Sequence, residues 1–119
     1  MFLGFSFTKA DRILKRNEFI EISKNGRRIQ DEYFIANFAP GRFDRCRLGV
    51  TVIRKVGGAV KRNRIKRLVR EYFRLNRQLV TGHWDINIIA KKKAADLSSE
   101  KVFASLQNLF DRISSCVDQ

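Results

Sequence analysis

The apolar residues of the chain repeat with two different periods, and each period predicts one kind of element. Over residues 33–39, and again over 47–53, apolar side chains alternate as they do in strands that bury one face. Proline and glycine in the segment 40–44 between them are typical of a turn, so the two runs predict an antiparallel hairpin. An isoleucine-rich run over 84–90 predicts another strand, and residues 28–30 predict a short additional one.

Helical periodicity covers three further segments, residues 17–25, 59–76 and 99–116. Gly26 follows the first helix and suits a left-handed exit from it. The second helix begins after Gly57 and Gly58. The third helix carries an apolar stripe whose members recur at spacings of four, three and four residues: Val102, Leu106, Leu109 and Ile113.

The predicted order of elements is α-β-β-β-α-β-α, which is an α+β fold, an α/β sandwich whose helices cover a central sheet of about four strands. The chain has 119 residues, of which 44% are hydrophobic, and this is enough apolar material for one core. Because the chain contains no repeat and no low-complexity linker, we expect residues 1–119 to form a single domain.

The 25 Lys and Arg residues outnumber the 12 Asp and Glu residues, so the formal net charge is +13. Such an excess favours a polyanionic partner, with nucleic acid first and an anionic membrane surface second. No apolar run approaches the roughly 18 residues of a membrane span, and the apolar first seven residues lack a signal-peptide pattern. We therefore expect a cytoplasmic protein in which Cys46 and Cys116 are reduced.

Enzymes that use their own side chains are poorly supported by this sequence. His83 is the only histidine, which excludes a metal site built from several histidines, and it is expected to be structural or solvated. The carboxylates are scattered, and no serine, threonine or cysteine lies in a nucleophile motif. We expect no catalytic residue, no metal ligand and no tightly bound cofactor in the protein itself.

The excess charge is concentrated in residues 54–74, where nine basic residues face a single acidic one, Glu71, for a net charge of +8. On a helix the apolar residues of this segment fall on one side and most of the basic ones fall on the other. Four basic residues recur at four-residue spacing and repel one another: Arg62, Lys66, Arg70 and Arg74. An idle solvated face is the alternative, but this pattern and the preference for arginine favour a phosphate-binding face.

Two further features leave alternatives open. The amides at Gly57 and Gly58 favour a phosphate contact at the start of the helix, or the pair forms a plain strand-to-helix turn. Phe19 and one face of the strand over 33–39 suggest a second surface, on which single-stranded RNA stacks on aromatic rings inside a basic rim. Alternatively, Phe19 is a core residue of its helix.

The run VGGAVKRNRIKRLVRE over residues 56–71 closely resembles the "RNR" motif of the protein component of bacterial ribonuclease P. Supporting segments span nearly the whole chain: RILKRNEF at 12–19, RLGVTV at 47–52 and DINIIA at 85–90. A bare RNR tripeptide would carry no weight, whereas the extended run with its flanking segments is highly specific.

The resemblance implies a left-handed connection from strand through RNR helix to strand, against the usual right-handed rule. It implies that the protein binds a large catalytic RNA and the 5′ leader of precursor tRNA. The RNA, with Mg²⁺, then performs the hydrolysis that releases the leader, and no membrane or obligate protein partner is expected. The implied RNA-binding residues lie on the RNR helix and the turn before it: Arg54, Lys55, Lys61, Arg62, Asn63, Arg64, Lys66, Arg67, Arg70 and Arg74.

The same resemblance, together with the second surface, assigns a cleft for the leader. Its expected members come from the first helix, one strand and the basic segment after residue 90: Arg16, Phe19, Ser23, Tyr33, Ile35, Asn37, Lys91 and Lys92. Ser23 stands where many family members carry a second aromatic residue, and Asn37 stands where an aromatic residue can occur, so contacts here are expected to depend less on stacking. A ribosomal RNA-binding protein with a similar small fold is the rival hypothesis, and binding to a membrane surface is a third.

Overall fold

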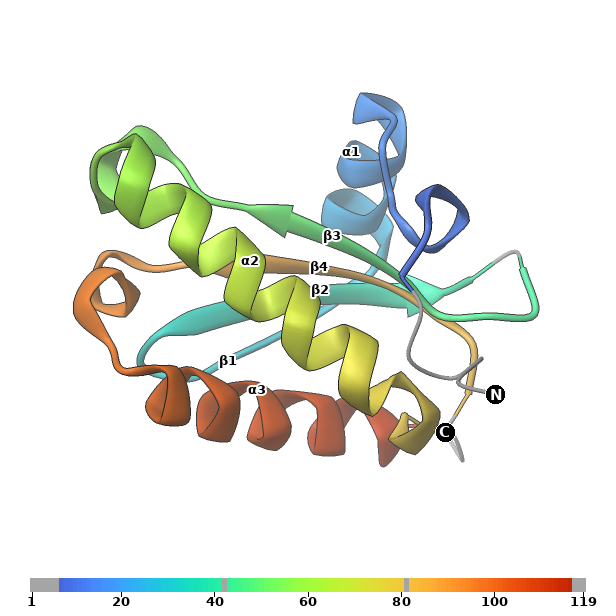
Figure 1. The fold of residues 1–119 in the computed structure, drawn as a ribbon. Coiled ribbons are helices and arrows are strands. Elements are labelled where there is room, and N and C mark those ends of the chain that lie inside the picture. The colour runs from blue at the N-terminus through green and yellow to red at the C-terminus, as the bar shows by residue number, and fades with distance from the viewer. Residues whose placement is uncertain (1–6, 42, 81, 117–119) are drawn as a thin grey trace.

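The computed structural model describes residues 7–41, 43–80 and 82–116 (Figure 1). Its helices are α1 (Arg16–Asn25), α2 (Ala59–Asn76) and α3 (Ser99–Ser114). Its strands are β1 (Arg27–Gln30), β2 (Phe34–Pro40), β3 (Arg47–Thr51) and β4 (Trp84–Ala90). This order confirms the predicted α-β-β-β-α-β-α sequence of elements and the α+β class. Short 3-10 turns occur at Lys9–Asp11, Arg54–Val56, Arg77–Leu79 and Lys92–Asp96.

The four strands form one mixed sheet with the order β1-β2-β4-β3. β2 pairs antiparallel with both β1 and β4, whereas β3 pairs parallel with β4. The predicted hairpin between residues 33–39 and 47–53 is therefore wrong, because β4 lies between these two strands. Alternation identified each strand but not its partner. β4 is buried along nearly its whole length, as expected of a strand that has both faces covered and neighbours at both edges.

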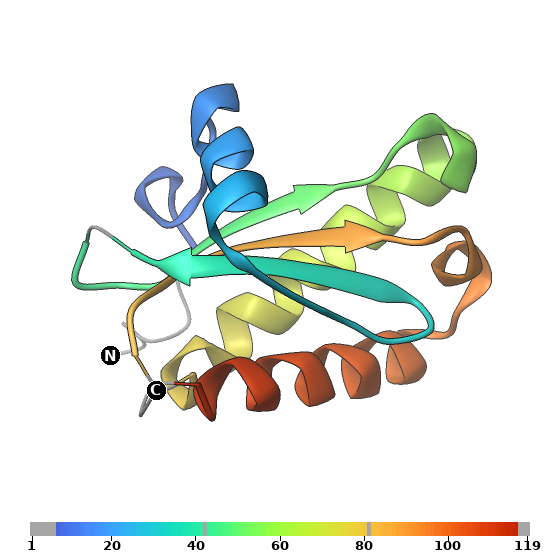
Figure 2. The same ribbon diagram turned by 180° about the vertical axis from the view of Figure 1, so that it is seen from behind.

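The connection from β3 through α2 to β4 is left-handed, as the resemblance implies. β3 lies above β4 in Figures 1 and 2, and the two strands run in the same direction. α2 crosses in front of the sheet in Figure 1 and behind it in Figure 2. Nearly all such connections between parallel neighbours have the opposite hand, which would place the helix on the other face of the sheet.

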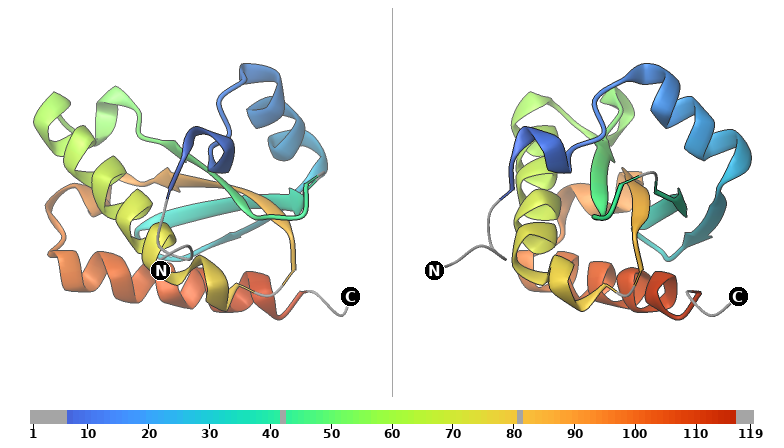
Figure 3. Two further views of the ribbon diagram at one scale, coloured as in Figure 1. Left: turned by 45° about the vertical axis from the view of Figure 1, so that its right-hand side comes forward. Right: turned by 90° about the vertical axis from the view of Figure 1, so that its right-hand side faces the viewer.

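The helices divide between the two faces of the sheet: α2 and α3 cover one face, and α1 lies on the other (Figure 3). The core fills the space between the sheet and α2 and α3. Its fully buried side chains come from β2, β3, β4, α2 and α3, and include Phe34, Phe38, Leu48, Ile86, Ile88, Ile65, Val69, Leu106 and Leu109. The stripe predicted for α3 is buried as a whole, and the Ser98 hydroxyl caps this helix by accepting from the amide of Lys101 at 3.3 Å.

Gly26 ends α1 for a reason other than the predicted left-handed exit, because its φ is −87°. A Cβ atom at this position would lie 2.5 Å from the carbonyl oxygen of Ile22 and 2.7 Å from that of Phe38. Both oxygens belong to the backbone and cannot move aside cheaply. Glycine is therefore needed because the chain passes close to β2 as it turns from α1 into β1.

Candidate nucleic-acid interface

α2 is held in one rotational position by its apolar side, and this position fixes where its basic side points. Ile65 and Val69 have no exposed surface, and Phe73 is 1% exposed. Tyr72 stacks on Phe110 of α3, with ring centroids 5.5 Å apart, and burial raises the pKa of its hydroxyl to about 12. The predicted core side of the helix is thus confirmed, and the basic residues opposite it face away from the core.

Three of the cations assigned to α2 bind within the protein. The Lys61 ammonium lies 2.9 Å from the carboxylate of Asp96, with both side chains at least half exposed. Arg64 donates to the carbonyl oxygen of Leu97 at 2.8 Å. Arg74 pairs with Glu71 through two hydrogen bonds of 2.8 and 2.9 Å. The first two contacts connect α2 to the segment that leads into α3.

The other cations of the segment show no ion pair within the described residues: Arg54, Lys55, Arg62, Lys66, Arg67 and Arg70. The Nε atom of Arg62 is buried and has no hydrogen-bond acceptor in this part of the chain. Burial, reinforced by the nearby charge of Arg12, lowers the pKa of Arg70. Arg62, Lys66 and Arg70, three members of the predicted repulsive row, therefore form no ion pair within the described residues, and their binding of phosphates stays a prediction.

The start of α2 follows the turn Arg54–Val56 and the two glycines. Gly58 is the N-terminal cap residue and supplies no side-chain acceptor to the first amides of the helix. Arg54, Lys55 and Asn63 are exposed here. This geometry is a strand-to-helix turn, and the phosphate contact at the glycines stays a prediction.

The second candidate surface is the sheet face on which α1 lies. The register places residues of this face in two rows that cross the four strands, Gln30–Ile35–Ile89–Thr51 and Arg28–Asn37–Asn87–Gly49. Arg28 donates to the side-chain oxygen of Asn37 at 3.0 Å, and the Thr51 hydroxyl donates to the side-chain oxygen of Asn87 at 3.2 Å. The face is therefore polar and internally hydrogen-bonded, in contrast to the apolar face beneath α2 and α3.

Phe19 projects from α1 onto this polar face. A Cβ atom on Gly49 would overlap its ring, so the phenyl group rests directly on the β3 backbone. Phe19 is partly buried and lies outside the main core cluster. Arg16 and Ser23 fall on neighbouring positions of the same helix side at 100° per residue, and both are exposed. We name the surface formed by these α1 residues and the two rows the sheet cleft.

The structure brings together most of the residues assigned to the leader cleft, but not all of them. Ile35 and Asn37 lie on the sheet cleft with Phe19. Tyr33 precedes β2 and packs against the core cluster. Lys91 donates to the carbonyl oxygen of Asp31 at 2.7 Å, whereas Lys92 is exposed in the turn after β4.

Several polar residues of the sheet cleft were not identified from the sequence. Thr51 and Asn87 belong to segments that were recognised as strands, whereas Arg28 was expected in the basic rim of this surface. Their alternation gives each residue a face of its own strand, but the shared face appears only once the register is known. The sequence therefore indicated on which face of its own strand each residue lies, and only the strand pairing showed that these faces form one surface.

A buried ionic network supports α1 where it crosses the sheet. Arg47 donates to Asp85 at 3.0 and 2.8 Å and to Glu18 at 2.9 Å. The hydrogen bond from Arg47 lowers the pKa of Glu18, and the bonds to Asp85 raise that of Arg47. These contacts fix the angle of α1 and with it the position of Phe19.

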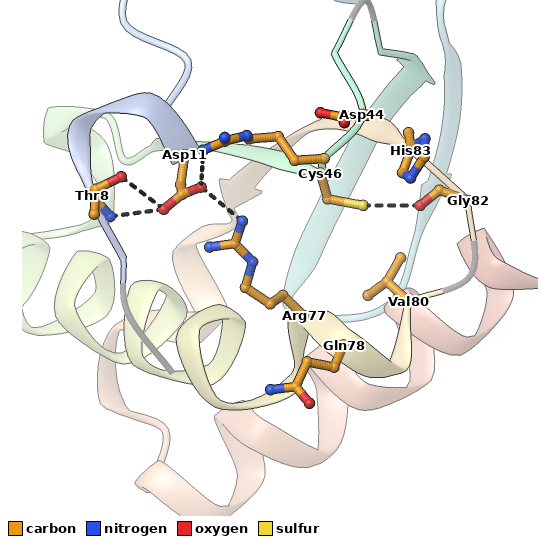
Figure 4. A pocket seen from close by; sticks show the side chains of 10 residues that line it. Thr8, Asp11, Asp44, Cys46, Arg77, Gln78, Val80, Gly82 and His83 are labelled. Carbon is orange, nitrogen blue, oxygen red and sulfur yellow. Dashed lines mark hydrogen bonds and ion pairs between the residues drawn. The ribbon is translucent and has the colours of Figure 1, made fainter. Parts of the chain in front are cut away.

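A polar cavity of about 650 Å³ lies at the end of α2 (Figure 4). Asp11 is 3% exposed and accepts from Arg77 at 2.7 Å and from Arg45 at 3.2 Å. The hydrogen bond from Arg77 lowers the pKa of Asp11, whereas burial raises that of the Cys46 thiol. His83 is exposed at the rim. The ion pairs of Asp11 fasten the N-terminal segment to the end of α2.

No group of three or more metal-binding side chains is present within residues 7–41, 43–80 and 82–116. In the same part of the chain, no helix combines the length and the apolar character needed to cross a membrane.

Fold and surface together define a small α+β protein with a cationic helix over one face of the sheet and a polar surface carrying Phe19 on the opposite face. A family model described as Ribonuclease P matches residues 7–114, and the chain belongs to this family.

The relatives and solved structures agree with this assignment. A ribonuclease P protein component from Desulfatibacillum aliphaticivorans is 53% identical over 111 residues, which cover 93% of this chain and 94% of the relative. The structure of the Staphylococcus aureus RNase P protein has a TM-score of 0.81 and 34% identity, covering 87% of this chain and 94% of that one. The RNase P protein from Thermotoga maritima has a TM-score of 0.80 and 39% identity, covering 86% and 96%.

Proposed function

We propose that the chain binds the catalytic RNA of ribonuclease P through the basic side of α2 and holds the 5′ leader of precursor tRNA in the sheet cleft. Hydrolysis is carried out by the RNA with Mg²⁺, and the product is the mature 5′ end of the tRNA. Membership of the ribonuclease P family supports the partnership with RNA. The residues that make the contacts are inferred from charge, exposure and geometry.

The observation that carries this proposal is the row of Arg62, Lys66 and Arg70, which has a buried apolar back and no acidic partner within the described residues. Like charges at four-residue spacing destabilise a free helix by a few tenths of a kcal/mol per pair. A phosphate backbone offsets this repulsion and, in addition, releases its condensed counterions. The row is therefore better explained as a binding face for a polyanion than as a solvated face without a partner.

The sheet cleft supports the second part of the proposal. Single-stranded RNA is held by aromatic stacking and by hydrogen bonds to exposed base edges and to the 2′-hydroxyl groups. Phe19 offers the ring, while Thr51 and the exposed Arg28 offer polar groups on the same face. Asn37 is only 3% exposed and accepts from Arg28, so it positions that cation. The C-terminal end of β3 leads from Thr51 to Arg54 and then into α2, so the two RNA surfaces meet at one end of this strand.

The protein then acts by lowering the repulsion between two RNAs. Cations between catalytic RNA and leader reduce the electrostatic cost of their approach, and contacts to phosphates carry little base information. Specificity therefore follows the shape of the RNAs, and the protein strengthens substrate and metal-ion binding most when other cations are scarce.

Reconstitution tests the proposal. The cognate RNA is assayed for cleavage of precursor tRNA at low Mg²⁺, with and without the protein. We expect the protein to restore cleavage that the RNA alone performs poorly. Unchanged cleavage on addition of folded protein would contradict the proposal.

Phe19→Ala tests the assignment of the cleft, and Ile20→Ala is its matched control because Ile20 is the next residue of α1 and is 44% exposed. Loss of one stacked base costs about 1–3 kcal/mol, so Phe19→Ala should weaken binding of precursor tRNA about tenfold. Binding of mature tRNA, which has no leader, should change little. Equal losses on both RNAs would remove Phe19 from leader recognition.

A further inference from the structure

A second groove flanks α1 on the side opposite the sheet cleft. It has a volume of about 540 Å³ and lies between the turn Lys9–Asp11, the start of α1 and residues 43–47. We name it the α1 groove. The side chains that matter for its chemistry are Lys9, Arg12, Lys15, Phe43, Arg45 and Arg47.

Phe43 gives the α1 groove an aromatic surface in a fixed position. Its side chain is 52% exposed, and the guanidinium carbon of Arg47 lies 4.8 Å from the centroid of its ring. Arg47 is itself held by Asp85 and Glu18, so the cation beneath the ring is immobilised. A cation–π contact of this kind is worth about 0.5–1 kcal/mol at an exposed site. The outer surface of the Phe43 ring is thus open to solvent and available for contact with a ligand.

The charge of the α1 groove matches an anion. Its lining carries five cationic side chains and two carboxylates, Glu18 and Asp44, and Glu18 is already paired with Arg47. Lys9 and Lys15 show no ion pair within the described residues. An exposed aromatic ring bordered by unpaired cations is the combination that holds an unpaired nucleotide, with the base on the ring and the phosphate on the lysines.

The α1 groove continues the line of the sheet cleft. Arg47, Gly49 and Thr51 occupy alternate positions of β3 and share one face. Phe19 rests on Gly49, Arg47 lines the α1 groove and Thr51 lies in the sheet cleft. Four residues of a strand span about 13 Å, so the two surfaces lie about that far apart, on either side of α1.

We propose that the 5′ leader continues past the N-terminal end of α1 and that one of its nucleotides stacks on Phe43. Lys9 and Lys15 then contact the adjoining phosphates. This inference rests on the proposed function, because it extends the leader path from the sheet cleft. It assigns the α1 groove to leader nucleotides beyond those at Phe19, and therefore only to substrates whose leader is long enough to reach it.

The experiment measures binding of precursor tRNAs with leaders of about 4 and about 12 nucleotides to the reconstituted holoenzyme, lengths that bracket a single-strand site. Phe43→Ala should weaken binding of the long-leader substrate about fivefold or more and leave the short-leader substrate unchanged. Phe43→Trp should restore the affinity. Lys9→Ala combined with Lys15→Ala should reduce the salt dependence of long-leader binding alone.

Leu79→Ala is the matched control, since Leu79 is an apolar residue that is 75% exposed in the turn after α2. No effect of Phe43→Ala, or an equal effect on both leaders, would overturn the inference. Weaker binding of the catalytic RNA alone would also overturn it by assigning the groove to that RNA. Phe19→Ala tests the proposed function separately. If the sheet cleft holds the leader, this substitution should weaken binding of both precursor tRNAs relative to mature tRNA, even where Phe43→Ala has no effect.

Discussion

Arg67 and Arg64 stand three residues apart on α2, and the structure predicts different consequences when each is replaced by alanine. Arg67 is exposed and has no ion pair within the described residues. Arg64 donates to the carbonyl oxygen of Leu97. Arg67→Ala should therefore change binding of the catalytic RNA without changing stability, whereas Arg64→Ala should change both.

The expected effect of Arg67→Ala follows from counterion release. Each lost phosphate contact makes the plot of log affinity against log salt shallower by about 0.7–0.9. The affinity deficit of the variant should thus shrink about threefold between roughly 50 and 200 mM salt. Its free energy of unfolding should stay within about 0.5 kcal/mol of the original, as for most surface substitutions.

Arg64→Ala removes a charged donor from a partly buried carbonyl, and a hydrogen bond to a charged group contributes about 1.5–3 kcal/mol. Both partners are partly exposed, so we expect a loss near the lower limit, about 1.5 kcal/mol. The loss should loosen the segment between β4 and α3, which Arg64 and Lys61 connect to α2.

Filter binding across a salt series and urea denaturation measure the two quantities for both variants. Lys24→Ala serves as a control, because Lys24 is an exposed cation on α1 that points away from Phe19. A salt slope unchanged by Arg67→Ala would refute the assignment of this face to the catalytic RNA. Equal stability of the original protein and Arg64→Ala would show that the Leu97 contact contributes nothing.

Two further predictions concern the parts that hold the surfaces in place. Gly49→Ala should displace the Phe19 ring and reduce the preference for substrate with a leader, as measured by binding of precursor and mature tRNA. Asp11→Asn should lower the free energy of unfolding by about 3 kcal/mol at pH 7, because it removes the buried carboxylate that pairs with both Arg77 and Arg45. Since the folded-state pKa of Asp11 is lowered, its contribution is present above the unfolded pKa of about 3.9 and is lost as pH falls further. Urea denaturation should therefore give a difference between the two proteins that narrows below about pH 4; a constant difference would contradict the ion-pair explanation.

The local elements were largely predictable because each depends on a short-range pattern. α2 and β4 have the predicted bounds, and the α3 stripe is buried as expected. The pairing of the strands was not predictable, since alternation assigns faces but carries no information about which strand lies alongside. The predicted hairpin was wrong for this reason. The predicted left-handed exit at Gly26 was wrong because the need for glycine there comes from a close approach to β2, which depends on tertiary packing.

The candidate site likewise has features that follow from local sequence patterns and features that depend on long-range contacts. Helical geometry alone places Lys66, Arg67 and Arg70 opposite the core, and the structure agrees. Helical geometry does not show that Arg64 donates to the carbonyl oxygen of Leu97, because Leu97 lies 33 positions away along the chain. The charge pattern thus located the basic side of α2, whereas long-range contacts decide which of its cations are free of partners within the protein.

The left-handed connection explains how the two candidate RNA surfaces fit on so small a protein. α2 must return from the end of β3 to the start of β4, and it can do so across either face of the sheet. The usual right-handed path would place it over Arg47, Gly49 and Thr51, where it would fill the sheet cleft and displace α1. The left-handed path instead packs α2 on the apolar face carrying Leu48 and Val50 and leaves the polar face to α1. The handedness is therefore the feature that separates the cationic helix from the cleft while keeping both joined at the end of β3.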